Sequence, residues 1–188
     1  MAMQHTPLLM SKIIDRGAKV APNEEIVTAT ENGVRRQTYK ETRDRAHQLA
    51  HALADAGIAV GDRVGTFMWN GSRHLEAYQA CAGMGAVLHT LNIRLSEKDL
   101  EYIINHAEDQ IIIVDADILP LLEKLEGKMP TVRQVVIATE EGFEGWSTQL
   151  PNAVDYEDFI KGKPTHYEWP DIDENSPLGL CYTSGTTG

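Results

Sequence analysis

Short continuous apolar runs and stretches with helical spacing alternate along most of the chain. Continuous runs are typical of strands buried on both faces of a parallel sheet, whereas apolar residues three and four positions apart are typical of helices with one packed side. We expect strands at 63–69, 86–91, 110–115, 132–138 and 178–182, with helices at 72–85, from 96 onward and at 119–125. This order predicts an α/β fold in which βα units form a largely parallel sheet flanked by helices.

A small β-hairpin is predicted near the amino terminus. Two β-rich stretches, 25–30 and 34–38, flank Glu31-Asn32-Gly33. Asn-Gly between such stretches is the strongest short-range signal of a hairpin, because both residues tolerate the positive φ angles of the tightest turns.

Two helices border this hairpin. Thr38 and Glu41 have the spacing of a capping box, so that a helix follows them and ends at Gly57. An earlier helix is expected to have Thr6 as its cap and Pro7 as its first residue, and to end near Gly17.

Residues 139–177 differ in character from the rest of the chain. Glycines, prolines and an acidic run interrupt them, so we expect loop or linker with one short helix at 156–160. Residues 178–188 then consist of an apolar strand followed by a polar segment. We find no repeat of fixed period.

Charge and hydrophobicity exclude two classes of protein. The 188 residues include 17 Lys and Arg against 28 Asp and Glu, a net charge of −11, and no stretch clusters the basic residues. A nucleic-acid partner is not expected, because binding phosphates requires a basic face. The longest apolar runs, 111–114 and 118–122, fall far short of the roughly 20 residues that span a bilayer, so no transmembrane segment is expected.

The amino-terminal residues and the cysteines indicate a cytoplasmic location. Residues 1–7 lack the basic stretch and the apolar run of a signal peptide. Cys81 and Cys181 lie far apart and form no C-x-x-C pair, so we expect two buried free thiols in a reducing compartment.

The last six residues have the composition of a phosphate-binding loop. Thr183, Ser184, Gly185, Thr186, Thr187 and Gly188 follow an apolar strand. Glycines let backbone N–H groups turn toward an anion, hydroxyls add donors, and ligands bind at the carboxyl edge of parallel sheets. The segment is not a Walker A motif, which requires a lysine. Composition alone leaves two interpretations open, a phosphate loop and a plain polar turn.

The longer string Leu178-Gly-Leu-Cys-Tyr-Thr-Ser-Gly-Thr-Thr-Gly188 resembles the phosphate-loop motif of the adenylate-forming acyl-CoA synthetase superfamily. Gln37-Thr-Tyr-Lys-Glu41 and Tyr78–Asn92 resemble two earlier motifs of that superfamily. Within it, Met68-Trp-Asn70, His74-Leu-Glu76 and Gly83–Leu95 are most similar to bacterial medium- and long-chain fatty-acid–CoA ligases. Ile93 departs from the proline that is common there.

This resemblance implies a two-step reaction. A fatty acid attacks the α-phosphate of Mg²⁺-bound ATP to give an acyl-adenylate and pyrophosphate, and CoA then displaces AMP. Thr183, Ser184, Gly185, Thr186, Thr187 and Gly188 match the loop that holds the leaving phosphates, and Thr183 supplies the hydroxyl nearest to Mg²⁺. ATP, Mg²⁺ and CoA are therefore the implied cofactors, and a fatty acid is the implied substrate.

The resemblance also implies that these 188 residues are the amino-terminal portion of a large adenylation domain. The family's Pro-Lys-Gly continuation of the loop, its adenine-binding motif and its mobile C-terminal domain are missing, so we expect no catalytic residue in the chain and no activity from it alone. Two alternatives stay open: a non-catalytic assembly module, since the family's ligases resemble homodimers joined through their N-terminal domains, or an adenylating domain for another carboxylic acid.

The remaining candidates favour structural roles. His47 and His51 have the spacing of a zinc motif but lack its glutamate, so we expect histidines on a helix surface. His89 and Asn92 are expected to form a polar pair at a strand end.

Two further pairs are assigned in the same way. Asp115 and Asp117 lack the glycine and glutamate of a calcium loop and are interpreted as a strand end and a helix cap. Trp69 and Trp146 have no alternating basic neighbours and are expected to be packing residues.

Overall fold

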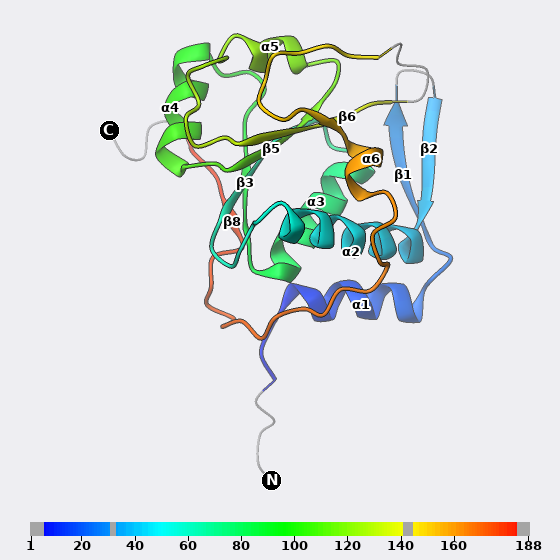
Figure 1. Ribbon diagram of the computed structural model, residues 1–188. Helices are drawn as coiled ribbons and strands as arrows, with labels where there is room; N and C mark the ends of the chain where they lie inside the picture. Colours follow the sequence, from blue (N-terminus) through cyan, green and yellow to red (C-terminus); the bar gives the residue numbers. More distant parts are fainter. Residues whose placement is uncertain (1–5, 31–32, 141–144, 184–188) are drawn as a thin grey trace.

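A six-stranded sheet forms the centre of the protein. The computed structural model describes residues 6–30, 33–140 and 145–183 (Figure 1). The strands are β3 (Arg63–Phe67), β4 (Val87–Thr90), β5 (Ile111–Asp115), β6 (Gln134–Ala138), β7 (Val154–Asp155) and β8 (Gly179–Leu180), in the order β7-β6-β5-β3-β4-β8. Every strand pairing within this sheet is parallel, which confirms the predicted α/β class.

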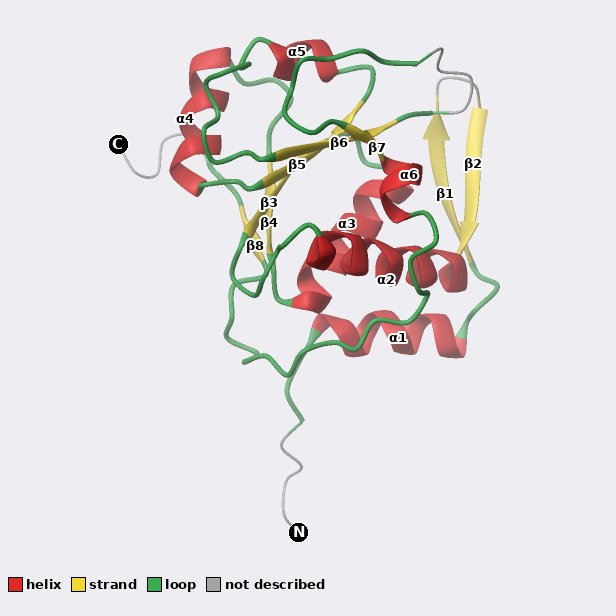
Figure 2. Ribbon diagram, in the orientation of Figure 1, coloured by secondary structure: helices red, strands yellow, loops and turns green. Residues whose placement is uncertain are grey.

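Helices cover both faces of the sheet. They are α1 (Met10–Val20), α2 (Tyr39–Asp55), α3 (Ser72–Met84), α4 (Glu97–Ala107), α5 (Leu119–Glu123) and α6 (Tyr156–Ile160). Figure 2 shows α4 and α5 on one side of the sheet and the other four on the opposite side. Ile111 and Ile113 pack toward α2 and α3, whereas Ile112 and Val114 pack toward α4 and α5, because successive side chains of a strand alternate between faces.

The hairpin and the helix that follows it form as predicted. β1 (Glu25–Thr30) pairs with β2 (Gly33–Thr38) in antiparallel register, and Thr30 lies opposite Gly33. Residues 31 and 32 of the turn lie outside the described residues. At the start of α2, the side chain of Thr38 accepts from the backbone N–H of Glu41, and the side chain of Glu41 accepts from that of Thr38. This is the expected capping box.

The predicted bounds of the first helix were wrong. It begins at Met10, after an extended Leu9, and passes through Gly17 to Val20. Residues 6–9 do not start the helix because other contacts hold them: Leu8 donates its backbone N–H to Glu174 at 2.7 Å, and the carbonyl of Pro7 accepts from Lys12. The helix continues past Gly17 because the next turn packs Ala18 in the interior.

Residues 145–177 form one helix and one strand, of which only the helix was predicted. α6 occupies the expected residues, but β7 also joins the sheet beside β6. Two residues are too few to produce a recognisable strand pattern. The last strand is also shorter than expected, with β8 limited to Gly179–Leu180.

A buried carboxylate links four elements. Glu76 of α3 is fully buried and accepts three hydrogen bonds: from Gln37 of β2 at 2.8 Å, from Arg45 of α2 at 2.8 Å and from the hydroxyl of Tyr156 at 2.6 Å. Burial of a carboxylate is tolerated because donors surround it. Removing one donor leaves part of the charge without a partner.

We therefore expect Tyr156→Phe to lower the free energy of unfolding by about 2 kcal/mol, the value of a hydrogen bond to a charged group. Tyr102→Phe is the matched control, because Tyr102 is exposed. Chemical denaturation measures both. A loss in Tyr156→Phe no larger than in the control contradicts this role.

The expectation that His47 lies on a helix surface was wrong. His47 is fully buried beneath residues 163–170: its Nδ1 accepts from the backbone N–H of Tyr167 at 2.7 Å, and its Nε2 lies 3.1 Å from Asp15. Trp169 donates to the same carboxylate at 3.1 Å. Because Nδ1 accepts a hydrogen bond, the neutral ring must carry its proton on Nε2.

Acidification is expected to destabilise the fold through His47. Burial lowers its pKa below 6.5, against the opposing effect of Asp15. The unfolded chain then binds the proton more tightly than the folded chain. The free energy of unfolding is therefore unaffected by this histidine above pH 6.5 and decreases as the pH falls below that value. His47→Asn keeps an acceptor for Tyr167 but does not titrate, so denaturation midpoints between pH 7.5 and pH 5 should fall less in this variant. Equal losses contradict the assignment.

Candidate functional site

The polar segment predicted to bind phosphate leaves the sheet at its carboxyl edge. β4 and β8 are parallel, so residues 91–96 and residues 181–183 leave the same edge. Thr183 is exposed there. Ser184, Gly185, Thr186, Thr187 and Gly188 lie outside the described residues, so the structure locates the base of the segment only.

Few backbone hydrogen bonds hold the start of this segment against the sheet. The register pairs Leu88 with Gly179 and His89 with Leu180, and the backbone N–H of Leu88 donates to Leu178 at 3.1 Å. Side chains add to this short pairing. The sulfur of Cys181 lies 3.2 Å from the hydroxyl of Thr90.

Tyr182 also contributes. Its hydroxyl lies 2.6 Å from Nδ1 of His106 on α4, and its ring packs beside His89. Burial raises its pKa above 10.

Two predictions about this region were wrong. Cys81 is buried as expected, but Cys181 is exposed, because it follows a strand at the edge of the sheet. His89 does not pair with Asn92. It is fully buried and bonded to Asp109, at 2.8 Å from Oδ2, whereas the exposed Asn92 accepts from the backbone of Arg94. The sequence did not suggest Asp109.

A second polar cluster lies where β3 and β5 end. Asp115 accepts from the backbone N–H of Trp69 at 2.6 Å, and Asp117 accepts from its indole at 2.8 Å. The N-cap of α5 is Ile118, so the prediction that Asp117 caps a helix was wrong. Trp69 is 51% exposed. Trp146 is half-buried against the α4–α5 side of the sheet. Burial raises the pKa of Asp115 to about 7, helped by Asp117 and Glu140 and opposed by the bond from Trp69.

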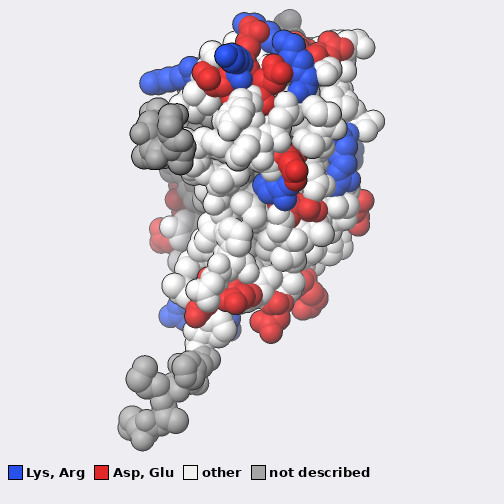
Figure 3. All heavy atoms as spheres, turned by 90° about the vertical axis from the view of Figure 1, so that its left-hand side faces the viewer, with Lys and Arg blue, Asp and Glu red and all other residues white. Residues whose placement is uncertain are grey.

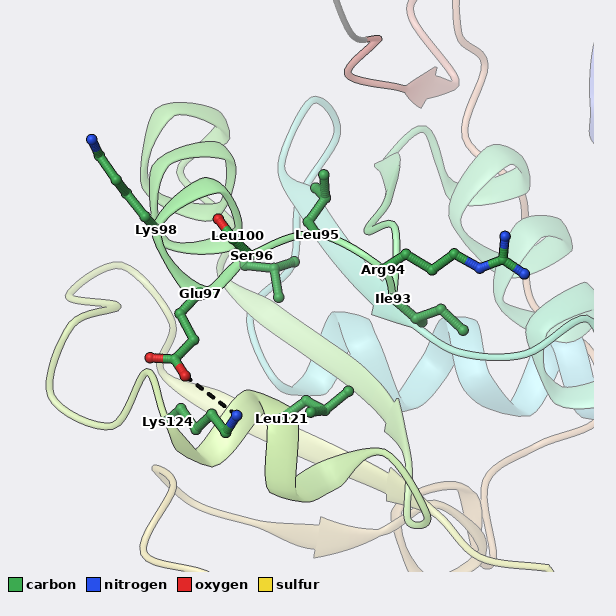
Figure 4. A pocket seen from close by; sticks show the side chains of 9 residues that line it. All are labelled: Ile93, Arg94, Leu95, Ser96, Glu97, Lys98, Leu100, Leu121 and Lys124. Atoms are coloured by element: carbon green, nitrogen blue, oxygen red, sulfur yellow. Dashed lines mark ion pairs between the residues drawn. The ribbon is translucent and has the colours of Figure 1, made fainter.

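A hollow of about 500 Å³ opens between the segment after β4 and helix α5. Figure 4 shows its lining, in which Ile93, Leu95 and Leu121 supply apolar surface and Glu97 forms a 3.3 Å ion pair with Lys124 across one side. Figure 3 looks onto the side of the molecule that carries α4 and shows basic and acidic side chains mixed, with uncharged residues between them. This face presents no continuous basic surface.

The described residues contain no ready-made metal site and no helix that could span a membrane. They hold no group of three or more His, Cys, Asp or Glu placed to bind a metal ion. None of their helices is both long enough and apolar enough to cross a bilayer.

Comparison with known proteins identifies the family. A model of the family described as AMP-binding enzyme matches residues 14–188. The chain belongs to the AMP-binding enzyme family. The resemblance drawn from its motifs is thereby confirmed, and the segment after β8 lies within the matched region.

Three curated relatives of this AMP-binding chain are similar along 99% of its length. They are a medium-chain-fatty-acid–CoA ligase from Ectopseudomonas oleovorans (39% identical, 34% of that protein covered), a 3-methylmercaptopropionyl-CoA ligase from Ruegeria pomeroyi (40%, 34%) and a long-chain-fatty-acid–CoA ligase from Thermus thermophilus (40%, 33%). The chain thus spans about a third of the length of these relatives.

A solved structure shares the fold. The crystal structure of the anthranilate CoA ligase AuaEII in complex with anthranoyl-AMP superimposes with a TM-score of 0.81, at 23% identity, over 98% of this chain and 33% of that one.

We expect Asp115→Asn to stabilise the protein more at pH 8 than at pH 5. A carboxyl with a raised pKa binds its proton more tightly in the folded state, so stability decreases as the pH rises from about 4 to about 7. The amide oxygen of asparagine still accepts from Trp69 but never ionises. Melting temperatures at the two pH values measure the effect, and a difference from wild type that does not change with pH contradicts it.

Proposed function

We propose that residues 1–188 form the amino-terminal portion of the large adenylation domain of an AMP-forming acyl-CoA ligase. The observation that carries the proposal is the family match up to residue 188, including the Thr, Ser and Gly segment that leaves the carboxyl edge of the sheet. Ligands bind at this edge in parallel α/β sheets.

In this proposal, the segment Thr183–Gly188 holds the β- and γ-phosphates of ATP. Pyrophosphate is the leaving group of the first step, so donors at this position meet negative charge that increases in the transition state. A carboxylic acid takes the AMP group in that step, and CoA displaces AMP in the second.

Mg²⁺ would be held mainly by the phosphate oxygens of ATP. The donors that the sequence offers in this segment are neutral hydroxyls and backbone groups, and the described residues form no acidic cluster that binds the ion unaided. The hydroxyl of Thr183 is the ligand that we assign from this chain. The bound ion supplies charge neutralisation at the phosphates.

The substrate class is an aliphatic carboxylic acid, and we favour a fatty acid. Of four relatives at 39–40% identity, two are named for medium- or long-chain fatty acids and two for 3-methylmercaptopropionate, while the motifs at residues 68–95 are most similar to the fatty-acid ligases. We propose a cytoplasmic enzyme. A domain for another carboxylic acid is the alternative within the same family.

The experiment is ATP–pyrophosphate exchange with the full-length protein that carries these residues. We expect exchange that depends on octanoate or palmitate and exceeds that with 3-methylmercaptopropionate. The 188-residue chain alone should show none, because about two-thirds of a ligase of the relatives' length lies outside it. Exchange by the isolated chain contradicts the assignment of catalysis to later residues, and full-length protein inactive with every acid contradicts the proposed function.

A role in assembly is the second candidate, because apolar side chains gather on the outer face of the hairpin. Val27 and Val34 are 52% and 60% exposed there. We propose a homodimer formed through this amino-terminal region. Light scattering after size exclusion should give the dimer mass at tens of micromolar, and Val27→Lys should shift it to the monomer mass. A wild-type monomer at that concentration contradicts the dimer.

A further inference from the structure

Tyr182 connects the base of the proposed phosphate loop to two histidines. Its ring centroid lies 5.2 Å from that of His89 on β4 and 5.8 Å from that of His106 on α4. Its hydroxyl bonds to Nδ1 of His106 at 2.6 Å. Thr183 follows directly, so the position of the Tyr182 ring restricts where the loop begins.

His89 is in turn paired with Asp109, and both side chains are fully buried. Nδ1 of His89 lies 3.0 Å and 2.8 Å from the two carboxylate oxygens. An ionised carboxylate only accepts hydrogen bonds, so Nδ1 carries the proton and the ring has one orientation. Burial raises the pKa of Asp109, and the hydrogen bond from His89 opposes that effect.

The backbone makes room for this pair. Gly65 of β3 lies opposite His89 in the sheet, and a Cβ atom there would come within 3.1 Å of Oδ2 of Asp109 and 3.2 Å of Ile112. A side chain at position 65 would therefore displace the carboxylate. The sheet thus leaves space for a buried ionisable pair among apolar neighbours.

An apolar side chain at position 89 would fill the same space at lower cost, because burying two ionisable groups carries a desolvation penalty. Nε2 of His89 is buried and has no hydrogen-bond partner among the described residues. A second hydrogen bond within this part of the chain therefore does not explain why a histidine stands here. What the pair provides is a ring of fixed orientation beneath Tyr182.

We propose that His89 and Asp109 are positioning residues that fix Tyr182, and with it Thr183 at the start of the proposed phosphate loop, for binding ATP. The inference rests on the proposed function of that segment. β8 pairs over only two residues, so the side-chain contacts of Tyr182 supply the restraint that a longer strand would provide. Neither residue is assigned contact with the substrate.

The test measures steady-state kinetics of the full-length protein with His89→Asn. Asparagine keeps a donor for Asp109 but removes the ring beneath Tyr182. We expect the KM for Mg-ATP to rise about tenfold, while the KM values for the acid and for CoA stay within about twofold. Asn92→Ala, in the segment that follows the same strand, is the matched control because Asn92 is exposed, and it should leave all three values unchanged.

Hydrogen exchange provides a second measurement. The peptide that covers residues 178–183 should exchange faster in His89→Asn than in wild type, because Tyr182 loses its support. If His89→Asn does not fold, Tyr182→Leu tests the same connection, since Tyr182 is only half-buried. The same rise in the KM for Mg-ATP is expected.

A fall in kcat with all three KM values unchanged means that the pair only maintains the amount of folded enzyme, and overturns the inference. Unchanged exchange at residues 178–183 overturns it as well. If the wild type is active and the variants have the same KM for Mg-ATP, the positioning role is rejected and the proposed function stands. If the wild type is inactive, the proposed function itself is rejected.

Discussion

The parallel pairing of β3 with both β4 and β5 is the constraint on which the other elements depend. Because β5 is buried on both faces, its alternating isoleucines require a helical layer on each side, and the chain supplies α2 and α3 for one face and α4 and α5 for the other. The same pairing makes the central strands end together. Polar groups from distant parts of the sequence therefore meet at one edge.

The two polar clusters at this edge are held in different ways. Around Trp69, Asp115 and Asp117 use hydrogen bonds to one residue and remain partly exposed. Around Tyr182, the support is buried, with a histidine and an aspartate inside the sheet layer. We propose that the second arrangement fixes the start of the segment that carries the family's phosphate-loop motif, where binding of an anion would be most sensitive to an error in position.

The sequence predicted those features that depend on local chemistry. The capping box at Thr38, the helix at residues 156–160 and the buried strand predicted at 110–115 are encoded within a few consecutive residues, and all three form, the strand at Ile111–Asp115. The burial of His47 was not predictable in this way, because residues 163–170 cover it from the other end of the chain. The His89–Asp109 pair likewise depends on a glycine on a third element.

Local patterns also failed where an element is very short. β7 and β8 have two residues each, and their place beside β6 and β4 is set by the sheet and not by their own composition. The exposure of Cys181 follows from that edge position. For the terminal segment, composition left a phosphate loop and a polar turn open, and only the motif resemblance favoured the loop. The family match includes this segment, and its phosphate-binding role stays a prediction.

The central claim is that the segment after β8 binds the phosphates of ATP, and calorimetric titration of Mg-ATP into the 188-residue chain tests it most directly. The account predicts measurable binding by the wild-type chain and none by the double variant Thr186→Val, Thr187→Val, which keeps the size of both side chains but removes their hydroxyls. Equal binding by the two chains, or no binding by a wild-type chain shown to be folded, would contradict it.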